Sequence, residues 1–341
     1  MSGNKGEIDM KSGKISEAVL KRSVIKAVNK QEKQSMAAKA AVGQDAGLFV
    51  QEEMTGVMAA SCTSLSGSED GLAALAVKRV CNSLAASGAK PAAVTVQVML
   101  AEFAEEKELK DKIQEVLAAC EEAGVVLANG HTQISSFITE PVISVTAIGS
   151  APAIMTLEET VYGSDLVMTK SAGLAGAVLL AKHYRENLHE RYTYSFIDKA
   201  AVRAAEISVL PEIKVLQGMG IRHMHDVAEG GVFGAVWELC ERLSAGVELD
   251  LKKIPICQET VEICEYFDVN PYQLKGDGAL LFLTHDSTAV IKTLKEAGIS
   301  AAVIGRMKEG NDRILINEDE TRFLEPNRVD GYEKARKTER K

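Results

Sequence analysis

Four short segments of the chain place small residues and polar side chains beside an apolar run. They are residues 43–46 (GQDA), 82–91 (NSLAASGAKP), 129–132 (NGHT) and 225–231 (HDVAEGG). Glycine beside a carboxylate permits close approach of the backbone to an anion or a metal ion. Gly230 and Gly231 precede a helical pattern, so their N–H groups would lie at the positive end of a helix dipole. These features predict a site for an anion or a metal ion.

The same residues also have purely structural interpretations. Asp226 is a residue type that commonly forms turns and caps helices. The dipeptide Asn129-Gly130 is typical of a plain turn, and His131 alone is a weak signal. His223 and His225 are interpreted as hydrogen-bonded turn residues, because the sequence offers His225 no evident third metal ligand.

Length and composition limit the class of protein. The chain has 341 residues, and chains beyond roughly 250–300 residues usually form more than one core, which predicts two domains. Its richness in Ala, Val and Leu suits helices packed on sheets better than an all-β sandwich. The net charge of −9 gives no electrostatic footprint for nucleic acid or an anionic membrane. Backbone N–H groups can nevertheless hold a phosphate without basic side chains.

Cysteine usage and the N-terminal residues bear on the compartment. The six cysteines form no C-x-x-C pair, which predicts free thiols in a reducing compartment rather than disulfides or structural zinc. Cys62 is expected to be buried. No signal-peptide pattern is evident, and no apolar run approaches the roughly 18–20 residues of a membrane span. We therefore expect a cytoplasmic protein.

Hydrophobic periodicity predicts the elements that would position these segments. The first half has the order β-β-α-β-α-β-β after an N-terminal helix, an α+β pattern with a mixed sheet. The predicted helices are residues 14–29, 70–87 and 105–122. Residues 43–50 are predicted to form a turn that enters a strand, and the other predicted strands are residues 57–60, 93–100, 125–127 and 141–148.

The register changes near residues 151–154, where we place a domain boundary. The second half is predicted to be an α/β domain with a turn at residues 223–231. Its predicted strands are 165–170, 248–251, 278–284 and 301–305, and its predicted helices are 175–183, 197–217, 232–243 and 287–297. The predicted domains are therefore residues 1–150 and 151–330, followed by a charged tail, 331–341, that is expected to fray.

In this order and spacing, the segments resemble the AIR synthase (PurM-like) superfamily. That superfamily contains aminoimidazole ribonucleotide synthetase, thiamine-monophosphate kinase, selenophosphate synthetase and the HypE-type hydrogenase maturation factors. Residues 43–46 are similar to its GDDAA turn, residues 80–91 to VNDLAxMGAxP, residues 130–132 to GDT or GGHS, and residues 225–231 to DPTRGG or HDxTEGG. Residues 13–15 (GKI) look like the N-terminal GK(L/I) of HypE-like proteins, which the chain resembles most.

The resemblance implies a fold and a ligand site. The N-terminal mixed-sheet domains of two copies would form a shared barrel in a homodimer, and the C-terminal α/β domain would pack against it and leave a cleft. In the family, ATP lies in that cleft with Mg²⁺ and aspartates. Carried over by position, the implied catalytic residues are Asp226 and His131, the implied metal ligands are Asp45 and Asp226, and the implied nucleotide-binding residues are Lys14, Asp45, Asn82, Ser83, Gly130, Thr132, Gly230 and Gly231.

Several family carboxylates are replaced in this chain. Cys62, in Ala-Ser-Cys, stands where the family has TTD, Ser83 replaces the aspartate of VND, and His131 replaces that of GDT. HypE proteins carry a C-terminal cysteine that receives a carbamoyl group, whereas this sequence ends in TERK and its last cysteine is Cys264.

These departures leave three functions open. The first is a HypE-like enzyme that uses ATP to activate a small carbonyl or carboxamide substrate, with a hydrogenase-maturation partner protein. The second is a non-catalytic, nucleotide- or metabolite-binding dimer of the same fold. The third is a small-molecule kinase like thiamine-monophosphate kinase, against which the replaced aspartates argue most strongly because phosphoryl transfer depends on metal.

Overall fold

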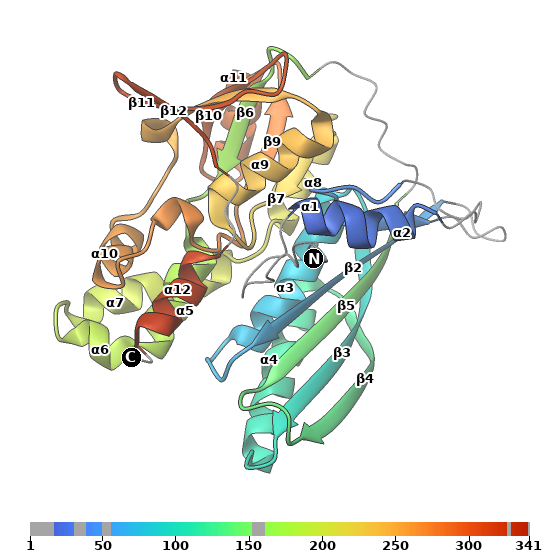
Figure 1. Ribbon diagram of the computed structural model, residues 1–341, viewed down its shortest axis with the longest axis vertical. Helices are drawn as coiled ribbons and strands as arrows, with labels where there is room; N and C mark the ends of the chain where they lie inside the picture. The colour runs from blue at the N-terminus through green and yellow to red at the C-terminus, as the bar shows by residue number, and fades with distance from the viewer. Residues whose placement is uncertain (1–16, 31–38, 50–55, 152–160, 326–328, 340–341) are drawn as a thin grey trace, which may run out of the picture.

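A five-stranded mixed sheet and two helices make up the first half of the protein (Figure 1). The computed structural model describes residues 17–30, 39–49, 56–151, 161–325 and 329–339. The strands lie in the order β1-β2-β5-β3-β4, and only β3 and β4 pair in parallel, so a helix must cross between them. The elements are β1 (Gly47–Phe49), β2 (Val57–Ser66), α3 (Leu72–Ala86), β3 (Lys90–Ala101), α4 (Glu106–Ala123), β4 (Val126–Ser135) and β5 (Val142–Ala151).

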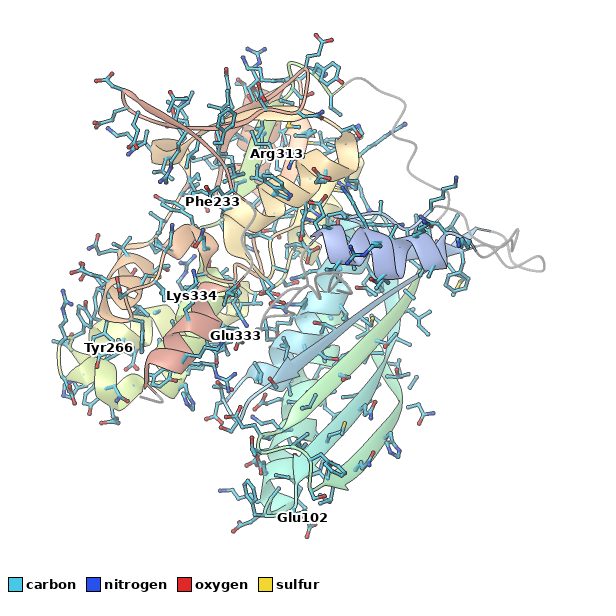
Figure 2. All side chains as sticks on the ribbon, in the orientation of Figure 1. Glu102, Phe233, Tyr266, Arg313, Glu333 and Lys334 are labelled. Carbon is cyan, nitrogen blue, oxygen red and sulfur yellow. The ribbon has the colours of Figure 1, made fainter. Side chains whose placement is uncertain are left out.

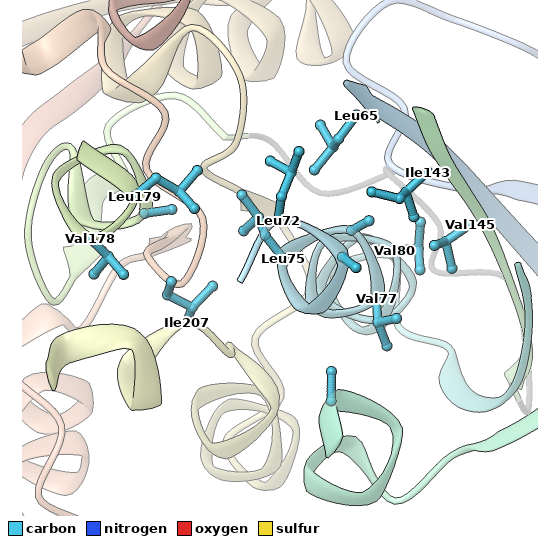
Figure 3. Close-up of a cluster of buried hydrophobic side chains, with 14 of the residues drawn as sticks. Leu65, Leu72, Leu75, Val77, Val80, Ile143, Val145, Val178, Leu179 and Ile207 are labelled. Atoms are coloured by element: carbon cyan, nitrogen blue, oxygen red, sulfur yellow. The ribbon is translucent and has the colours of Figure 1, made fainter. Parts of the chain in front are cut away.

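Helix α3 lies at the centre of the largest core. Leu72, Val77 and Val80 are buried, and the inward side chains Ile143 and Val145 of β5 pack against them. Leucine and valine side chains of α5 and the chain near Ile207 lie on the other side of α3 (Figure 3). Because α3 is covered on both sides, nearly all of its residues are buried, and the two halves of the protein share one hydrophobic core.

A seven-stranded sheet organises the second half. Its order is β12-β11-β8-β10-β6-β9-β7, and only β8 and β11 pair in parallel. The strands are β6 (Asp165–Thr169), β7 (Met224–Asp226), β8 (Gly246–Asp250), β9 (Leu280–Thr284), β10 (Ala301–Lys308), β11 (Arg313–Asn317) and β12 (Glu320–Phe323). The helices associated with this sheet are α8 (Leu210–Gly218), α9 (Gly231–Leu243) and α11 (Ser287–Glu296), with 3₁₀ turns η3 (Leu251–Lys253) and η4 (Pro271–Gln273).

A separate group of helices lies below this sheet in Figure 1. It consists of α5 (Leu174–His183), α6 (Arg185–His189), α7 (Tyr194–Ala201), the 3₁₀ helix η2 (Val202–Glu206), α10 (Gln258–Tyr266) and α12 (Gly331–Glu339). At the other end of the chain, α1 (Glu17–Leu20), the π-helical turn η1 (Lys21–Ile25) and α2 (Lys26–Val28) form one helical segment. Glu17 and Lys21 of this segment bind Trp237 and Glu241 of α9. No helix among the described residues is long and apolar enough to cross a membrane.

The predicted element order of the first half is confirmed, and so is the division into mixed sheets with helices. The interpretation of Asn129-Gly130 as a plain turn is wrong, because both residues lie inside β4. Gly130 pairs with Val96 of β3, and a Cβ at Gly130 would lie 3.0 Å from the Val96 carbonyl oxygen. Ladder formation with a distant strand has therefore overridden the local turn preference.

Further differences concern the second half. Residues 224–226 form β7 rather than a turn, and the single helix predicted at residues 197–217 is divided into α7, η2 and α8. Strands β11 and β12 and helix α10 were not predicted. The domain limits at residue 150 and residue 330 stay a prediction, since residues 152–160 and 326–328 lie outside the described chain.

The charged segment that was expected to fray instead forms α12 and closes the junction between the halves. Tyr332 is 1% exposed, and Ala335 is fully buried. Arg336 donates to the Ser66 carbonyl oxygen and pairs with Glu69 and Glu140, all in the first half. In Figure 2, Glu333 of α12 lies between the two halves. Apolar and Arg positions three and four residues apart give this short helix a buried face despite its charge.

We predict that Arg336→Met destabilises the protein by about 3–5 kcal/mol, because it leaves the buried Glu69 carboxylate without its cation. Lys337→Met on the exposed side of the same helix should change stability by less than about 0.5 kcal/mol. Urea unfolding followed by circular dichroism measures both. Equal midpoints for the two variants would show that α12 does not hold the junction.

Candidate functional site

A cavity of about 170 Å³ lies between the two halves, and side chains from both sheets line it. The first half contributes the turn before β1, the middle of β2 and one face of α3. The second half contributes β7, the turn that follows it, and α9. The lining residues are Gln44, Asp45, Ser61, Cys62, Thr63, Arg79, Val80, Ser83, His225, Asp226, Ala228 and Glu238.

Gly43 allows the turn that carries Asp45 to lie directly on α9. Its φ is +71°, and a Cβ at this position would be 2.2 Å from the carbonyl oxygen of Glu238. Any other residue would push the turn away from α9. The glycine predicted to permit close approach to a ligand thus permits close approach to another helix, and it places the carboxylate of Asp45 beside the cavity.

Asp45 and His225 form the most compact contact of the site. Nδ1 of His225 lies 2.5 Å from Oδ1 of Asp45, and Nε2 lies 3.4 Å from Oε2 of Glu238. Arg242 approaches the other oxygen of Asp45 at 3.4 Å. Burial disfavours the imidazolium, but the neighbouring carboxylate of Asp45 outweighs this effect and raises the pKa of His225 to about 9. His225 lies in β7, so its interpretation as a turn residue is wrong.

Asp226 is a buried carboxyl group next to this pair. It is 5% exposed, and Oδ2 accepts a hydrogen bond from the Ser83 hydroxyl at 3.1 Å. Burial first, and then the negative charge of Asp45, raise the pKa of Asp226 to about 8. One ligand atom each of Asp45, His225 and Asp226 lies within 4.8 Å of the others. The structure therefore brings together three of the sequence-derived candidates, Asp45, Ser83 and Asp226, and adds His225.

Arg79 contributes a fixed cation to the cavity wall. Its Nε and Nη2 atoms donate to the two oxygens of Asp277 at 2.5 and 2.9 Å, and both side chains are nearly fully buried. Sequence reasoning missed Arg79, Asp277, Glu238 and Arg242. For Arg79 a signal existed, since it lies four residues before Ser83 and therefore on the same helical face.

The remaining candidate residues lie elsewhere. Asn82 is buried in α3, where its Oδ1 accepts a hydrogen bond from the backbone N–H of Val209. The N–H of Gly230 donates to the Asp330 carboxylate at 2.6 Å, and Gly231 lies tightly against the backbone of residues 272–274. This glycine pair therefore serves packing around Asp330 in the structure.

The third candidate segment lies on an edge strand. Gly130, His131 and Thr132 are exposed on β4, with β3 and β5 between β4 and β2, and none of them lines the cavity. Lys14 lies outside the described residues. Their roles stay predictions. Cys62, which was expected to be buried, is exposed and lies on the cavity wall.

The cavity residues can be tested against the Mg²⁺ that the family resemblance implies. Asp45 and Asp226 offer carboxylate oxygens, which Mg²⁺ requires. The third donor, His225, is an imidazole, a ligand better suited to transition metals. The set therefore fits a divalent cation but departs from an all-oxygen magnesium site.

Comparison with known proteins gives the family context. Residues 37–151 match the AIR synthase related protein N-terminal domain, and residues 162–317 match the AIR synthase related protein C-terminal domain. Carbamoyl dehydratase HypE of Rhizobium leguminosarum bv. viciae is 27% identical over 241 residues, which cover 68% of this chain and 67% of that protein.

Several solved structures share the fold. Hydrogenase maturation protein HypE in complex with ATP has a TM-score of 0.64 and 18% identity, covering 92% of this chain and 95% of that one. The HypE–HypF complex has a TM-score of 0.65 and 17% identity, covering 83% of this chain and 93% of that one. Thiamine monophosphate kinase from Aquifex aeolicus has a TM-score of 0.61 and 19% identity, covering 80% of this chain and 90% of that one. With both of its halves matched, this chain belongs to the AIR synthase related protein family and has its two-domain, PurM-like fold.

Proposed function

We propose that the protein is a HypE-like enzyme that uses ATP to phosphorylate the oxygen of a small carbonyl or carboxamide substrate. The observation that carries this proposal is the cavity between the halves, where Asp45, Asp226 and Arg79 converge. The relatives supply the class of reaction, since their names are carbamoyl dehydratase and one HypE structure holds ATP. Their partner HypF supports a hydrogenase-maturation protein as the partner here.

Positioning and charge neutralisation are what phosphoryl transfer asks of a protein. Asp45 and Asp226 would hold a divalent cation, which neutralises charge on the phosphates when bound. The guanidinium of Arg79, fixed in its plane by Asp277, offers a second positive charge on the cavity wall. A cation that is already held in place loses little entropy when it binds phosphate.

Asp226 has the properties of the general base. The substrate oxygen forms a bond to the γ-phosphorus, the bond from phosphorus to the bridging oxygen breaks, and ADP leaves. A carboxamide that reacts through oxygen must lose a proton from its nitrogen, and the Asp226 carboxylate accepts it. In the cation-free protein, burial raises the pKa of Asp226 to about 8, and a bound cation would lower this pKa, so that the carboxylate could accept the proton through the oxygen that does not hold the cation.

A binding protein without turnover is the second candidate. Two observations favour it: Asp45 is already contacted by His225 and Arg242, and the N–H of Gly230 is engaged by Asp330. Such a protein would bind nucleotide or metabolite without releasing ADP. A kinase like thiamine-monophosphate kinase is a weaker candidate, because HypE proteins resemble this chain in sequence over two thirds of its length, whereas the solved kinase, at 19% identity, shares the fold.

We further propose that the protein is a homodimer. Among the described residues, α3 and α4 pack on one face of the first sheet, Ser64, Ser144 and Thr146 lie on the other face, and most residues of the edge strand β4 are exposed (Figure 1). An exposed ten-residue edge strand without lysine or proline is a strong template for pairing with another chain. A second copy that covers this face would form the shared barrel that the family resemblance implies.

The first prediction concerns turnover. Asp226→Asn should lower carboxamide-dependent ADP release by about 100-fold or more, because it removes the base, and Asp45→Asn should do the same by removing a cation ligand. Asp319→Asn, in an exposed turn, is the control and should match the wild type. A coupled ADP assay with small carboxamides and carbamoylated thiols measures this. Wild-type protein that ATP stabilises but does not turn over would establish the binding alternative.

The second prediction concerns pH. Both raised pKa values mean that the folded protein holds protons more tightly than the unfolded chain, so stability falls as pH rises. The contribution of His225 is complete below about pH 6.5 and is lost through pH 9, and that of Asp226 is lost between about pH 4 and pH 8. Asp45 and Asp277 are the other carboxylates acting on Asp226.

Melting temperatures from pH 5 to pH 9.5 test this prediction. They should fall less steeply in Asp226→Asn than in the wild type, because an amide does not titrate. Asp319→Asn should follow the wild-type curve. Parallel curves for Asp226→Asn and the wild type would mean that Asp226 has an ordinary pKa.

The third prediction concerns the dimer. Light scattering after gel filtration should give twice the chain mass of 36.6 kDa. Ile148→Lys, which places a charge on the uncovered face of the sheet, should give a monomer, because an unpaired charge is costly to bury. Val202→Lys, at a site that is 72% exposed in the second half, should leave the dimer intact. A monomeric wild type would contradict the proposed dimer.

A further inference from the structure

We propose that Asp45, His225 and Asp226 form a site that prefers a divalent transition-metal ion, in the series from Mn²⁺ to Zn²⁺, over Mg²⁺. The proposal refines the cation of the proposed function, and it can be tested without nucleotide or turnover. It depends on the chemistry of the three donors and on their burial.

The donor geometry suits a single ion. One atom from each of the three side chains lies within 4.8 Å of the others. Two ligands of one transition-metal ion, each bound at roughly 2.0–2.2 Å, lie no more than about 4.4 Å apart. The required adjustment is therefore a few tenths of an ångström. The closest pair, Nδ1 of His225 and Oδ1 of Asp45, must separate slightly from 2.5 Å to admit an ion.

Buried polar atoms point to a missing ligand. His225 is 3% exposed, and its two ring nitrogens contact the carboxylates of Asp45 and Glu238, so in the absence of a metal ion a proton supplies the positive charge between them. Asp226 is 5% exposed and receives a hydrogen bond from the neutral Ser83 hydroxyl, but it has no ion pair among the described residues. The nearby cation Arg79 is occupied by Asp277. A divalent ion would replace the proton between His225 and Asp45 and supply the positive charge that Asp226 lacks.

Imidazole determines which ion is favoured. Mg²⁺ binds hard oxygen ligands in near-ideal octahedra and dehydrates reluctantly. Nitrogen donors strengthen binding along the series from Mn²⁺ through Co²⁺ to Zn²⁺. Binding requires neutral imidazole, so the ion competes with a proton on His225 and with its ion pair to Asp45. This competition weakens binding of every ion, but only the transition metals gain the nitrogen bond in return.

The test uses full-length protein stripped with a chelator and free of nucleotide. Loss of the free Mn²⁺ signal in electron paramagnetic resonance should give one ion per chain, and Mg²⁺ should displace it only at tenfold or greater excess. His225→Gln should weaken Mn²⁺ binding at least tenfold and remove the preference over Mg²⁺. His223→Gln is the matched control, since His223 is also buried but does not line the cavity.

A second measurement needs no variant. Electron spin echo modulation of Mn²⁺ on the wild-type protein should show coupling to the nitrogen of an imidazole. Absence of Mn²⁺ binding, equal affinity for Mg²⁺, or lack of nitrogen coupling would each overturn the proposal and leave the Asp45–His225 ion pair in place of the metal. Failure of the proposed function is distinguishable, because metal binding would then persist without carboxamide-dependent ADP release.

Discussion

The buried pair of Arg79 and Asp277 is the contact on which the site depends. Arg79 belongs to α3 in the first half and Asp277 to the loop before β9 in the second, 198 positions away. Two parallel hydrogen bonds fix both the distance and the plane of the guanidinium. Because α3 also carries Ser83, this contact aligns the first half with Asp226 and sets the dimensions of the cavity. Loss of either partner would leave a charge buried without compensation.

Most charged groups that line the cavity are paired with groups of opposite charge, and Asp226 is the exception among the described residues. Asp45 faces His225 and Arg242, and Arg79 faces Asp277, so these groups nearly cancel. Asp226 forms no ion pair within the described part of the chain and accepts a hydrogen bond from the Ser83 hydroxyl; burial and the charge of Asp45 make it hold its proton tightly. A site of this kind is nearly neutral at rest. It can exchange the proton of Asp226 for a metal ion or a substrate, while the Arg79–Asp277 pair stays in place.

Local patterns predicted much of the fold. Alternating apolar residues in β3 and β5 and the i, i+3, i+4 spacing of α3 and α4 identified the elements of the first half in the correct order. Errors arose where distant partners decided the structure. Asn129-Gly130 became part of a strand because β3 supplied a ladder. The segment after Asp330 became a buried helix because Glu69 and Ser66 supplied partners for Arg336.

The residues of the candidate site were likewise predictable where a local pattern marked them and not where distant segments meet. Asp45, Ser83 and Asp226 could be named from short motifs, because each lies beside small residues in an ordered pattern. Glu238 and Asp277 could not, since their role arises only when separate segments meet, and for Arg79 the only signal was its position one helical turn before Ser83. The glycines were predicted to allow close approach to an anion or a metal ion, whereas in the structure Gly43 and Gly231 lie against other parts of the chain. A glycine motif therefore indicates where the backbone makes a close contact, but it does not show whether the contact is with a ligand or with another part of the chain.

The position of α12 after both sheets in the sequence also affects the order in which the protein folds during synthesis. Its Arg336 reaches the carbonyl of Ser66 across 270 positions of sequence. During synthesis, the residues of both sheets leave the ribosome before those of α12. The contacts of Arg336 with Ser66 and Glu69 therefore cannot form until α12 has been made. Contacts of such long range form late and slowly. In the interval, Glu69 and the Ser66 carbonyl oxygen are without the guanidinium group that Arg336 supplies in the finished fold.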